Sequence, residues 1–385
     1  MSECGSHSIT LSRRALLGGL ACGVLVGPAG NLALGADSAS SEWSFPLLGD
    51  LHFDRLEHHD QAWLAKEHPA DVTQVQNYSR ITREMTPKLL ARVRHSVTAL
   101  QQAGMSVPFV MQLGDLLEGL CGNEALAARQ AREGIDFVRE AGFSAPLVMT
   151  KGNHDITGPG AADAYQKILL PYLAEANQAS IDAANFTRRQ GGTLVVFYDA
   201  YDKGSLDCFA SVLAEARPDR LIVAIHPPVV PYNARSSWHI YSSPRQAEQR
   251  QRLLGLLGRQ RAIVLCGHLH KYSLLVRRTA EGRFLQLAIS SVAASATGAP
   301  RDVRSGAGEY QPELVELEPR HAPETVAMRR ELLAAERPFI EHFEYADSWG
   351  HAVLELNRGR LAAQIYRGLD ERPWRRHALD DLLAT

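Results

Sequence analysis

Cysteine is scarce in this sequence of 385 residues, and no two cysteines stand close together. The absence of a CxxC spacing argues against a zinc knuckle and against a dithiol redox site. A framework of disulfide bonds is not expected either, although one bond among the last three cysteines stays open in an oxidising compartment. Any metal is therefore expected to be held by other side chains. The cysteines are Cys4, Cys22, Cys121, Cys208 and Cys266.

An excess of charge of one sign is also lacking. The chain has 41 basic and 43 acidic residues, which leaves a formal charge of −2 at pH 7. This balance provides no field that would attract nucleic acid or an anionic membrane surface, so neither is expected as a partner. With 45% hydrophobic and 22% charged residues, the composition is that of a globular protein with a large core. The 15 histidines are more informative, because several stand beside carboxylates, where neutral imidazole can bind a metal.

Long apolar runs are missing except near the N-terminus. Arg13 and Arg14 directly precede an uncharged run rich in glycine and alanine, from 15 to 36, which is typical of an export signal. The paired arginines resemble a twin-arginine leader, whose cargo crosses the membrane folded. We interpret residues 1–36 as a cleaved export signal and expect a periplasmic or cell-envelope protein without stable membrane association after cleavage. The alternative is an N-terminal anchor, since about 20 residues cross a bilayer.

Short apolar runs alternate with helical patterns over the rest of the chain, and no internal repeat is present. This alternation predicts an α/β sandwich with one main domain, which we place at residues 43–295. Residues 53–86 read as a long polar insertion, and residues 296–385 as a C-terminal extension with a late β-hairpin over 353–366. The predicted strands are 45–48, 107–113, 145–149, 194–198, 221–225, 262–266, 274–277 and 284–289. The predicted helices are 87–103, 123–140, 161–176, 206–215 and 244–260.

Five of the predicted strands end in polar clusters. Because ligands bind at the carboxyl ends of strands in open α/β sheets, these clusters are expected to meet in one place. Each fragment alone is common in solvated loops and helix caps, but five in order at strand ends favour a shared site. The fragments are Asp50-Leu51-His52, Gly114-Asp115, Gly152-Asn153-His154-Asp155, His226 and Gly267-His268-Leu269-His270.

This ordered set resembles the signature of the calcineurin-like metallophosphoesterases. The resemblance implies a layered αββα sandwich of two mixed β-sheets flanked by helices. It also implies two divalent or trivalent transition metal ions, such as Fe, Zn or Mn, which suit histidine and carboxylate ligands. By similarity, one metal is held by Asp50, His52 and His270, and the second by Asn153, His226 and His268. Asp115 would bridge the two metals.

The residue after Asn153 has a role of its own by the same resemblance. His154 would face the leaving-group oxygen and donate a proton or stabilise the transition state. Asp155 would orient that imidazole, with capping of a nearby turn as the alternative. Purple acid phosphatases have tyrosine three residues after the bridging aspartate, where this chain has Glu118, so no tyrosinate–iron site is expected. The Asp-x-His motif instead resembles the branch with cyclic-nucleotide and glycerophosphodiester phosphodiesterases.

Substrate recognition is less sharply marked in the sequence. Arg235 and His239 follow His226 closely enough to bind phosphate, and Trp238 and Tyr241 are candidates for stacking on a base or sugar. The alternative is that these residues only pack the loop. In the insertion, His58 and His59 are either extra ligands or part of a solvated polar lid.

The resemblance thus predicts a binuclear metal-dependent phosphoesterase that hydrolyses a small phosphomonoester or phosphodiester by attack of metal-bound hydroxide. Two alternatives stay open. One is a non-catalytic metal- or phosphate-binding protein of the same fold, and the other is a pyrophosphatase that acts on nucleotide-sugar or lipid intermediates. The sequence does not indicate an oligomeric state.

Overall fold

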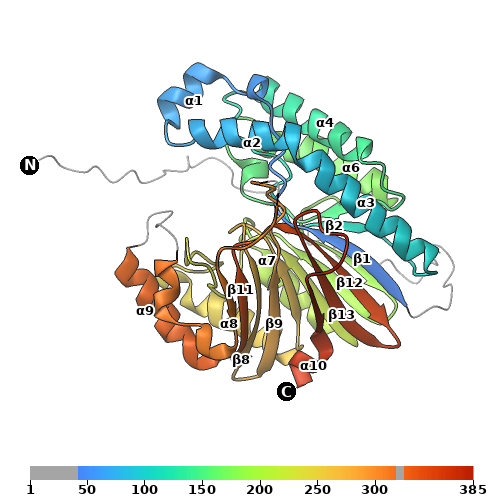
Figure 1. Ribbon diagram of the computed structural model, residues 1–385, viewed down its shortest axis with the longest axis vertical. Helices are drawn as coiled ribbons and strands as arrows, with labels where there is room; N and C mark the ends of the chain where they lie inside the picture. The colour runs from blue at the N-terminus through green and yellow to red at the C-terminus, as the bar shows by residue number, and fades with distance from the viewer. Residues whose placement is uncertain (1–41, 296, 318–324, 385) are drawn as a thin grey trace, which may run out of the picture.

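Two mixed β-sheets face each other, and helices cover their outer faces (Figure 1). A computed structural model describes residues 42–295, 297–317 and 325–384. The predicted layered αββα sandwich is confirmed. The predicted export signal, residues 1–36, lies outside the described residues. None of the described helices combines the length and apolar character that a membrane crossing requires.

The first sheet joins the N-terminal strands to strands from the end of the chain. Its order over the described residues is β14-β13-β12-β1-β2-β3, with β1, β2 and β3 parallel and the other pairs antiparallel. The register pairs Leu47 with Met111 on one side and Phe45 with Leu354 on the other. The strands are β1 Trp43–Leu48, β2 Val110–Gln112, β3 Leu147–Met149, β12 Gly350–Asn357, β13 Arg360–Arg367 and β14 Arg375–Ala378.

The second sheet has the order β10-β11-β8-β9-β7-β6-β5-β4 in the described part of the chain. Strands β5, β6, β7 and β9 are parallel, and antiparallel strands close both edges. The strands are β4 Phe186–Gln190, β5 Thr193–Tyr198, β6 Arg220–Ile225, β7 Ile263–Cys266, β8 Tyr272–Thr279, β9 Gly282–Ala288, β10 Val303–Ser305 and β11 Ile340–Ala346.

Successive side chains of the central strands pack alternately into two hydrophobic cores. In β6, Ile222 and Ala224 join the core between the sheets, whereas Leu221, Val223 and Ile225 join the core on the outer face of the second sheet. Successive side chains point to opposite faces, so a strand buried on both faces is apolar throughout. The outer helices are α3 Thr86–Gln102, α4 Glu124–Glu140 and α6 Leu170–Asn177 beside the first sheet, and α7 Ser205–Ala216, α8 Ala247–Arg259 and α9 Val326–Glu336 beside the second (Figure 1).

The predicted helix 161–176 is a composite in the structure. It begins as α5 Ala161–Ala164, continues through the π-helical turn Tyr165–Leu169, and ends as α6. A π-turn inserts an extra residue per turn and so rotates the following side chains relative to those before it. The carboxyl end of the segment is closed by Gln178 in the left-handed conformation, at φ 48°.

The insertion after β1 is helical and packed, not a solvated lid. It contains a 3₁₀ turn Leu56–His58, α1 Gln61–Glu67 and α2 Val72–Glu84. Both histidines are buried, and each pairs with a carboxylate away from the candidate ligands: His58 Nε2 lies 3.0 Å from Glu133, and His59 Nε2 lies 2.6 Å from Asp54. The alternative that His58 and His59 are extra metal ligands is therefore wrong, and so is the solvated lid.

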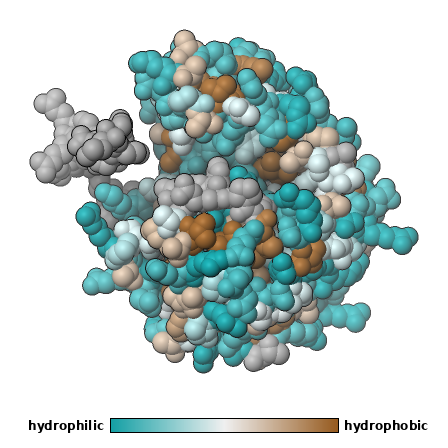
Figure 2. Space-filling view, turned by 60° about the vertical axis from the view of Figure 1, so that its left-hand side comes forward, coloured by the Kyte–Doolittle hydropathy of each residue, from teal (hydrophilic) through white to brown (hydrophobic). Residues whose placement is uncertain are grey.

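The C-terminal strands complete both sheets. The expected hairpin is formed by β12 and β13, and β12 also pairs with β1, while β11 pairs with β8. The short α10 Leu379–Ala384 buries Leu379 and Leu383 in the core between the sheets. Hydrophilic side chains dominate the face in Figure 2, with apolar surface gathered near its middle. Because β12 pairs with β1, the C-terminal hairpin supports the strand that ends at the Asp50-Leu51-His52 motif.

Candidate metal centre

Candidate ligands follow the carboxyl ends of parallel strands in both sheets. Asp50 and His52 come after β1, Asp115 after β2, His226 after β6 and His268 after β7. Four of the predicted ligands have left-handed backbone: φ is 45° at His52, 55° at Asp115, 72° at His268 and 53° at His270. This conformation costs on the order of 1 kcal/mol or more for a residue with a Cβ. Such strain, concentrated in one place, indicates that the fold is constrained to aim these side chains.

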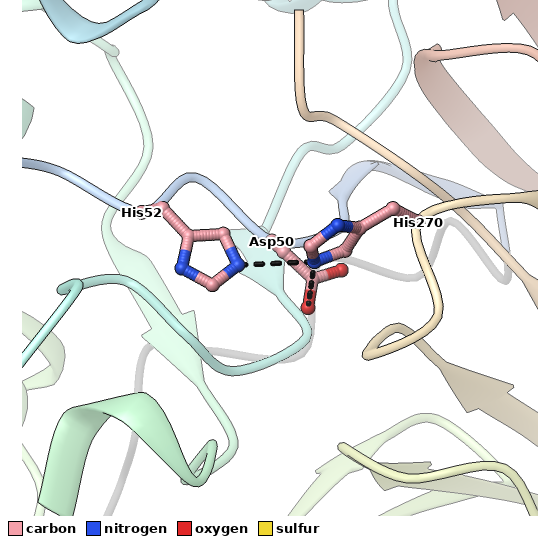
Figure 3. A group of neighbouring side chains, drawn as sticks. All are labelled: Asp50, His52 and His270. Carbon is pink, nitrogen blue, oxygen red and sulfur yellow. Dashed lines mark hydrogen bonds and ion pairs between the residues drawn. The ribbon is translucent and has the colours of Figure 1, made fainter. Parts of the chain in front are cut away.

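The first group joins the Asp-x-His motif to the last histidine of the Gly-His-x-His motif. The ligand atoms of Asp50, His52 and His270 all lie within 4.8 Å of one another. His52 Nε2 is 3.0 Å from His270 Nε2, which in turn is 3.6 Å from Asp50 Oδ1 (Figure 3). Two imidazole nitrogens and a carboxylate oxygen therefore point at a common centre. This is the donor set predicted for one metal.

The second group contains Asp115, His226 and His268, again with ligand atoms within 4.8 Å of one another. His226 Nε2 is 3.1 Å from both Asp115 Oδ2 and His268 Nδ1. The same nitrogen is 3.2 Å from the amide oxygen of Asn153. Asp115 Oδ2 is also 3.8 Å from His52 Nε2 of the first group, so Asp115 lies between the two groups. The structure thus brings all seven predicted ligands together.

Glycines allow the loops to approach each other this closely. A Cβ at Gly152 would lie 2.1 Å from both the backbone N and Oδ1 of Asp115. A Cβ at Gly114, where φ is 88°, would lie 2.6 Å from His226 Nδ1. Real Cβ atoms do not approach other atoms so closely, and positive φ favours glycine as well. Glycine at 114 and at 152 is therefore required by the packing of one ligand loop against the next.

Asp155 does not orient His154, contrary to the sequence prediction. Its carboxylate accepts hydrogen bonds from the backbone N–H groups of Asp115, Leu117 and Gly152, at 2.8–3.0 Å. These bonds fix the turn that carries Asp115. The alternative, in which Asp155 caps a nearby turn, describes the structure better, because the carboxylate binds backbone N–H groups from two loops.

Glu118 takes the position expected of Asp155. Its Oε2 is 2.7 Å from His52 Nδ1 and 3.4 Å from His154 Nδ1, and His154 Nδ1 is also 2.8 Å from the Glu118 backbone oxygen. The Glu118 Oε1 accepts a hydrogen bond of 3.0 Å from Gln74 on α2. In the sequence, Glu118 is marked only by its position, where purple acid phosphatases have tyrosine. The available signal was its spacing of three residues from Asp115.

Buried carboxylates set the protonation of the histidines. Burial lowers the pKa of His154, but the charges of Glu118 and Asp115 outweigh it and raise this pKa to about 9. Burial likewise lowers the pKa of His226, and the Asp115 carboxylate overcomes it to give a pKa of about 9.

His268 and His270 shift in the opposite direction. Burial and the neighbouring His226 lower the pKa of His268 to about 3. Burial also lowers the pKa of His270, against the pull of Asp50. Both imidazoles are therefore neutral at pH 7, which is the form that binds a metal.

A pocket of about 400 Å³ opens over the two groups. Among the predicted substrate residues, Arg235 and Trp238 line it, and the Trp238 ring lies 4.7 Å from that of His268. His239 does not reach the pocket: it is buried, and its Nδ1 is 2.8 Å from the backbone oxygen of Ser237. Tyr241 is not part of the lining either, since its hydroxyl lies 2.6 Å from that of Tyr198.

Two further aromatic residues in the pocket lining were not found from the sequence. Tyr78 on α2 stacks on His52 with ring centroids 4.2 Å apart. Tyr201 donates a hydrogen bond of 3.4 Å to the Asn153 side-chain oxygen. Neither belongs to a short motif, so only the folded chain reveals their position.

Comparison with known proteins gives matches only among solved structures. No family model and no curated protein matches the sequence. A structure of PhoD is 10% identical in sequence to this chain, with a TM-score of 0.48. The match covers 88% of this chain and 68% of the PhoD chain. A purple acid phosphatase from yellow lupin (Lupinus luteus) seeds is 13% identical, covering 88% and 53%, with a TM-score of 0.49. A dimetal phosphatase from Danio rerio is 13% identical, covering 86% and 97%, with a TM-score of 0.47.

In fold and motif order this chain resembles the calcineurin-like metallophosphoesterases. These three structures are less than 25% identical to this chain and have TM-scores below 0.5, so they establish no activity for it. The donor set fits a pair of transition metals. Each group offers at least two histidines and one carboxylate, with neutral imidazole at His268 and His270, and Asp115 lies between the groups.

Proposed function

We propose that the chain is a metal-dependent phosphoesterase that hydrolyses a small phosphomonoester or phosphodiester. The observation that carries the proposal is the convergence of two donor groups on one pocket, with Asp115 in contact with both. Asp50, His52 and His270 would hold one metal, and Asn153, His226 and His268 the second, with Asp115 shared. When bound, such a pair supplies a nucleophile at neutral pH and neutralises charge on the non-bridging phosphate oxygens.

The chain itself supplies proton donation at the leaving group. His154 lines the pocket and has a raised pKa of about 9, so its imidazolium is populated at pH 7. Cations in the pocket would repel this proton and bring the pKa nearer to neutrality, which suits a general acid. Glu118 opposes that repulsion and holds the Nδ1 side of the ring, so Nε2 is left to face the substrate.

Binding of the phosphate is assigned to residues that line the same pocket. Arg235 lines the pocket, and a guanidinium matches the geometry of two phosphate oxygens. Trp238 and Tyr78 provide apolar walls for the organic part of the ester. The pocket of about 400 Å³ favours a small molecule over a polymer.

We also propose that the chain is exported through the twin-arginine-like leader at residues 1–36.

Metal analysis coupled to a substrate panel tests this function. The purified chain should contain close to two transition metal ions, and the metal-replete protein should hydrolyse at least one of an aryl monoester, an aryl diester or a cyclic nucleotide. A pyrophosphate completes the panel as the substrate of the alternative function. His270→Ala should lose metal and activity. His239→Ala, a buried histidine outside the pocket, is the matched control and should keep both.

Two results would contradict the proposal. Metal binding without turnover of any substrate would favour the non-catalytic binding protein. Turnover of the pyrophosphate alone would favour the pyrophosphatase.

A further inference from the structure

Helix α2, in the insertion after β1, directs one side at the loop that carries His52. Gln74, Tyr78 and Thr82 are spaced by four residues, so their side chains lie on the same side of the helix. Gln74 donates to the Glu118 carboxylate, Tyr78 lies on the imidazole of His52, and Thr82 contacts the backbone of the same loop. These three residues are called here the inner face of α2. None of them belongs to the five motifs on which the proposed function rests.

The contacts around His52 hold this residue from three directions. The ring of Tyr78 stacks on the imidazole, with centroids 4.2 Å apart and an angle of 4° between the planes. At the edge of the imidazole, Nδ1 is 2.7 Å from Oε2 of Glu118. Thr82 Oγ1 donates a hydrogen bond of 3.3 Å to the backbone oxygen of His52 and accepts one of 3.0 Å from the backbone N–H of Asp54. The ring face, the ring edge and the backbone are therefore all fixed, and Nε2 is the ring nitrogen left for a metal.

The backbone of His52 needs such support. It is left-handed, with φ 45°, and a residue with a Cβ keeps this conformation only where the surrounding structure fixes it. Tyr78 also reaches the other imidazole of the first group, since its hydroxyl is 3.5 Å from His270 Nδ1 and the two rings meet at 81°. Within the described residues, none of the hydrogen bonds or ring contacts of the inner face involves a ligand of the second group.

We propose that the inner face of α2 positions the ligands of the first metal site and so sets the affinity of that site separately from the affinity of the second. This inference rests on the proposed function, which supplies the two metals. Gln74, Tyr78 and Thr82 are positioning residues in this scheme, because they act on the metal through His52, His270 and Glu118. The insertion after β1 is then a working part of the metal centre.

Metal affinity measured one site at a time tests the inference. His268→Ala removes a ligand of the second group and leaves the first group complete, whereas His270→Ala does the reverse. Competition between each chain and a chelator for Zn²⁺ then gives the affinity of one site alone. Added to His268→Ala, Tyr78→Leu should lower the affinity of the first site by about 10- to 100-fold, the range for losing an outer partner of a metal-binding histidine. Added to His270→Ala, the same change should leave the affinity of the second site unchanged.

Two further variants separate positioning from folding. Tyr78→Phe keeps the stacked ring and loses only the long hydroxyl contact, so it should restore most of the first-site affinity that Tyr78→Leu loses. Val75→Ala is the matched control on the same helix, at a buried residue that clusters with Leu64 and Leu120. This control should lower the melting temperature and change neither metal affinity.

Gln74→Met covers the case in which Tyr78→Leu does not fold. Gln74 is half-buried, and methionine has a similar length, so this change removes the hydrogen bond to Glu118 and little else. It should lower the affinity of the first site severalfold and spare the second. An unchanged first site in the folded variants, or an equal loss at both sites, would overturn the inference. Absence of metal binding by the wild type would instead refute the proposed function, and the wild-type measurement shows this before any variant is compared.

Discussion

Replacing Glu118 with glutamine should weaken the candidate metal centre without changing its shape. The glutamate is fully buried, and its Oε2 lies 2.7 Å from His52 Nδ1 and 3.4 Å from His154 Nδ1. Glutamine has the same size and can still accept from one imidazole, but it carries no charge. Its amide N–H groups would also face the Gln74 amide, which now donates to Glu118 Oε1.

The size of the effect follows from the distances. Two unit charges about 4 Å apart interact by about 4 kcal/mol at an effective dielectric constant near 20, before relaxation of the surroundings. Measured losses for removing the hydrogen-bond partner of a metal-binding histidine are smaller, about 10- to 100-fold in metal affinity or activity. We expect Glu118→Gln to lose about tenfold in metal affinity and about tenfold in kcat.

The pH dependence gives a second readout with a defined sign. Glu118 is the largest of the influences that raise the pKa of His154 against burial. Without the Glu118 carboxylate the His154 imidazolium is less stable, so the pKa of His154 falls. His154 then loses, at a lower pH, the proton that the leaving group needs. The alkaline limb of the kcat profile should therefore move to lower pH by about one unit, since one unit corresponds to about 1.4 kcal/mol.

The assay is a competition with a chelator for metal, combined with kcat measured from pH 5 to 10. Glu133→Gln is the matched control, because Glu133 also pairs with a histidine, His58 Nε2 at 3.0 Å, but outside the pocket. Unchanged metal affinity together with an unchanged alkaline limb in Glu118→Gln would refute the positioning role. A loss of the same size in Glu133→Gln would show a general effect on folding.

Three more outcomes follow from the site. His154→Ala should lower kcat by about 10²- to 10⁴-fold while the metal content stays at the wild-type value, because a general acid is lost and no ligand is removed. Metal affinity should rise with pH up to about 9, by as much as tenfold per pH unit. The reason is that a metal would displace a proton from His226, whose pKa is raised to about 9. Calorimetry in buffers of different ionisation enthalpy measures this proton release. Gly152→Ala should lower the melting temperature and the metal content together, because its Cβ would lie 2.1 Å from Asp115.

Each of these predictions has an outcome that contradicts it. Full activity in His154→Ala would remove that residue from the reaction. A metal affinity independent of pH between 6 and 9 would mean that His226 is not a ligand. A wild-type melting temperature and metal content in Gly152→Ala would show that the close approach of the two ligand loops is not required.

The central strands were predictable because they are buried on both faces. Strand β7, and β6 after its first residue Arg220, consist of apolar residues that precede the motifs directly, so the sequence marks both their position and their ends. The edge strands carry no such signal. β4 contains Arg188 and Arg189, and β14 begins with Arg375 and Arg376, so neither is an apolar run. Their strand conformation is fixed by pairing with a neighbour rather than by their own composition.

The insertion and the partner of His154 show a different limit. Helix α2 buries Val75, Tyr78 and Ile81 at intervals of three residues, but most of its other residues are polar, so its helical period is easily missed. The predicted role of Asp155 was wrong because adjacency in sequence does not decide which carboxylate meets a side chain. The turn at Asp155 directs its oxygens to backbone N–H groups, and Glu118 arrives from another loop.

Charge and strain in the pocket together explain why the centre is suited to cations. Asp50, Asp115 and Glu118 are buried close together, and without positive charge among them their mutual repulsion would oppose folding. In the metal-free chain, protons on His154 and His226 provide that charge, as their raised pKa values indicate. Metal ions would take over this role with more charge in the same volume. The left-handed backbone at four ligands is then tolerated because the adjoining glycines, the Asp155 carboxylate and the buried strands hold the loops in one arrangement.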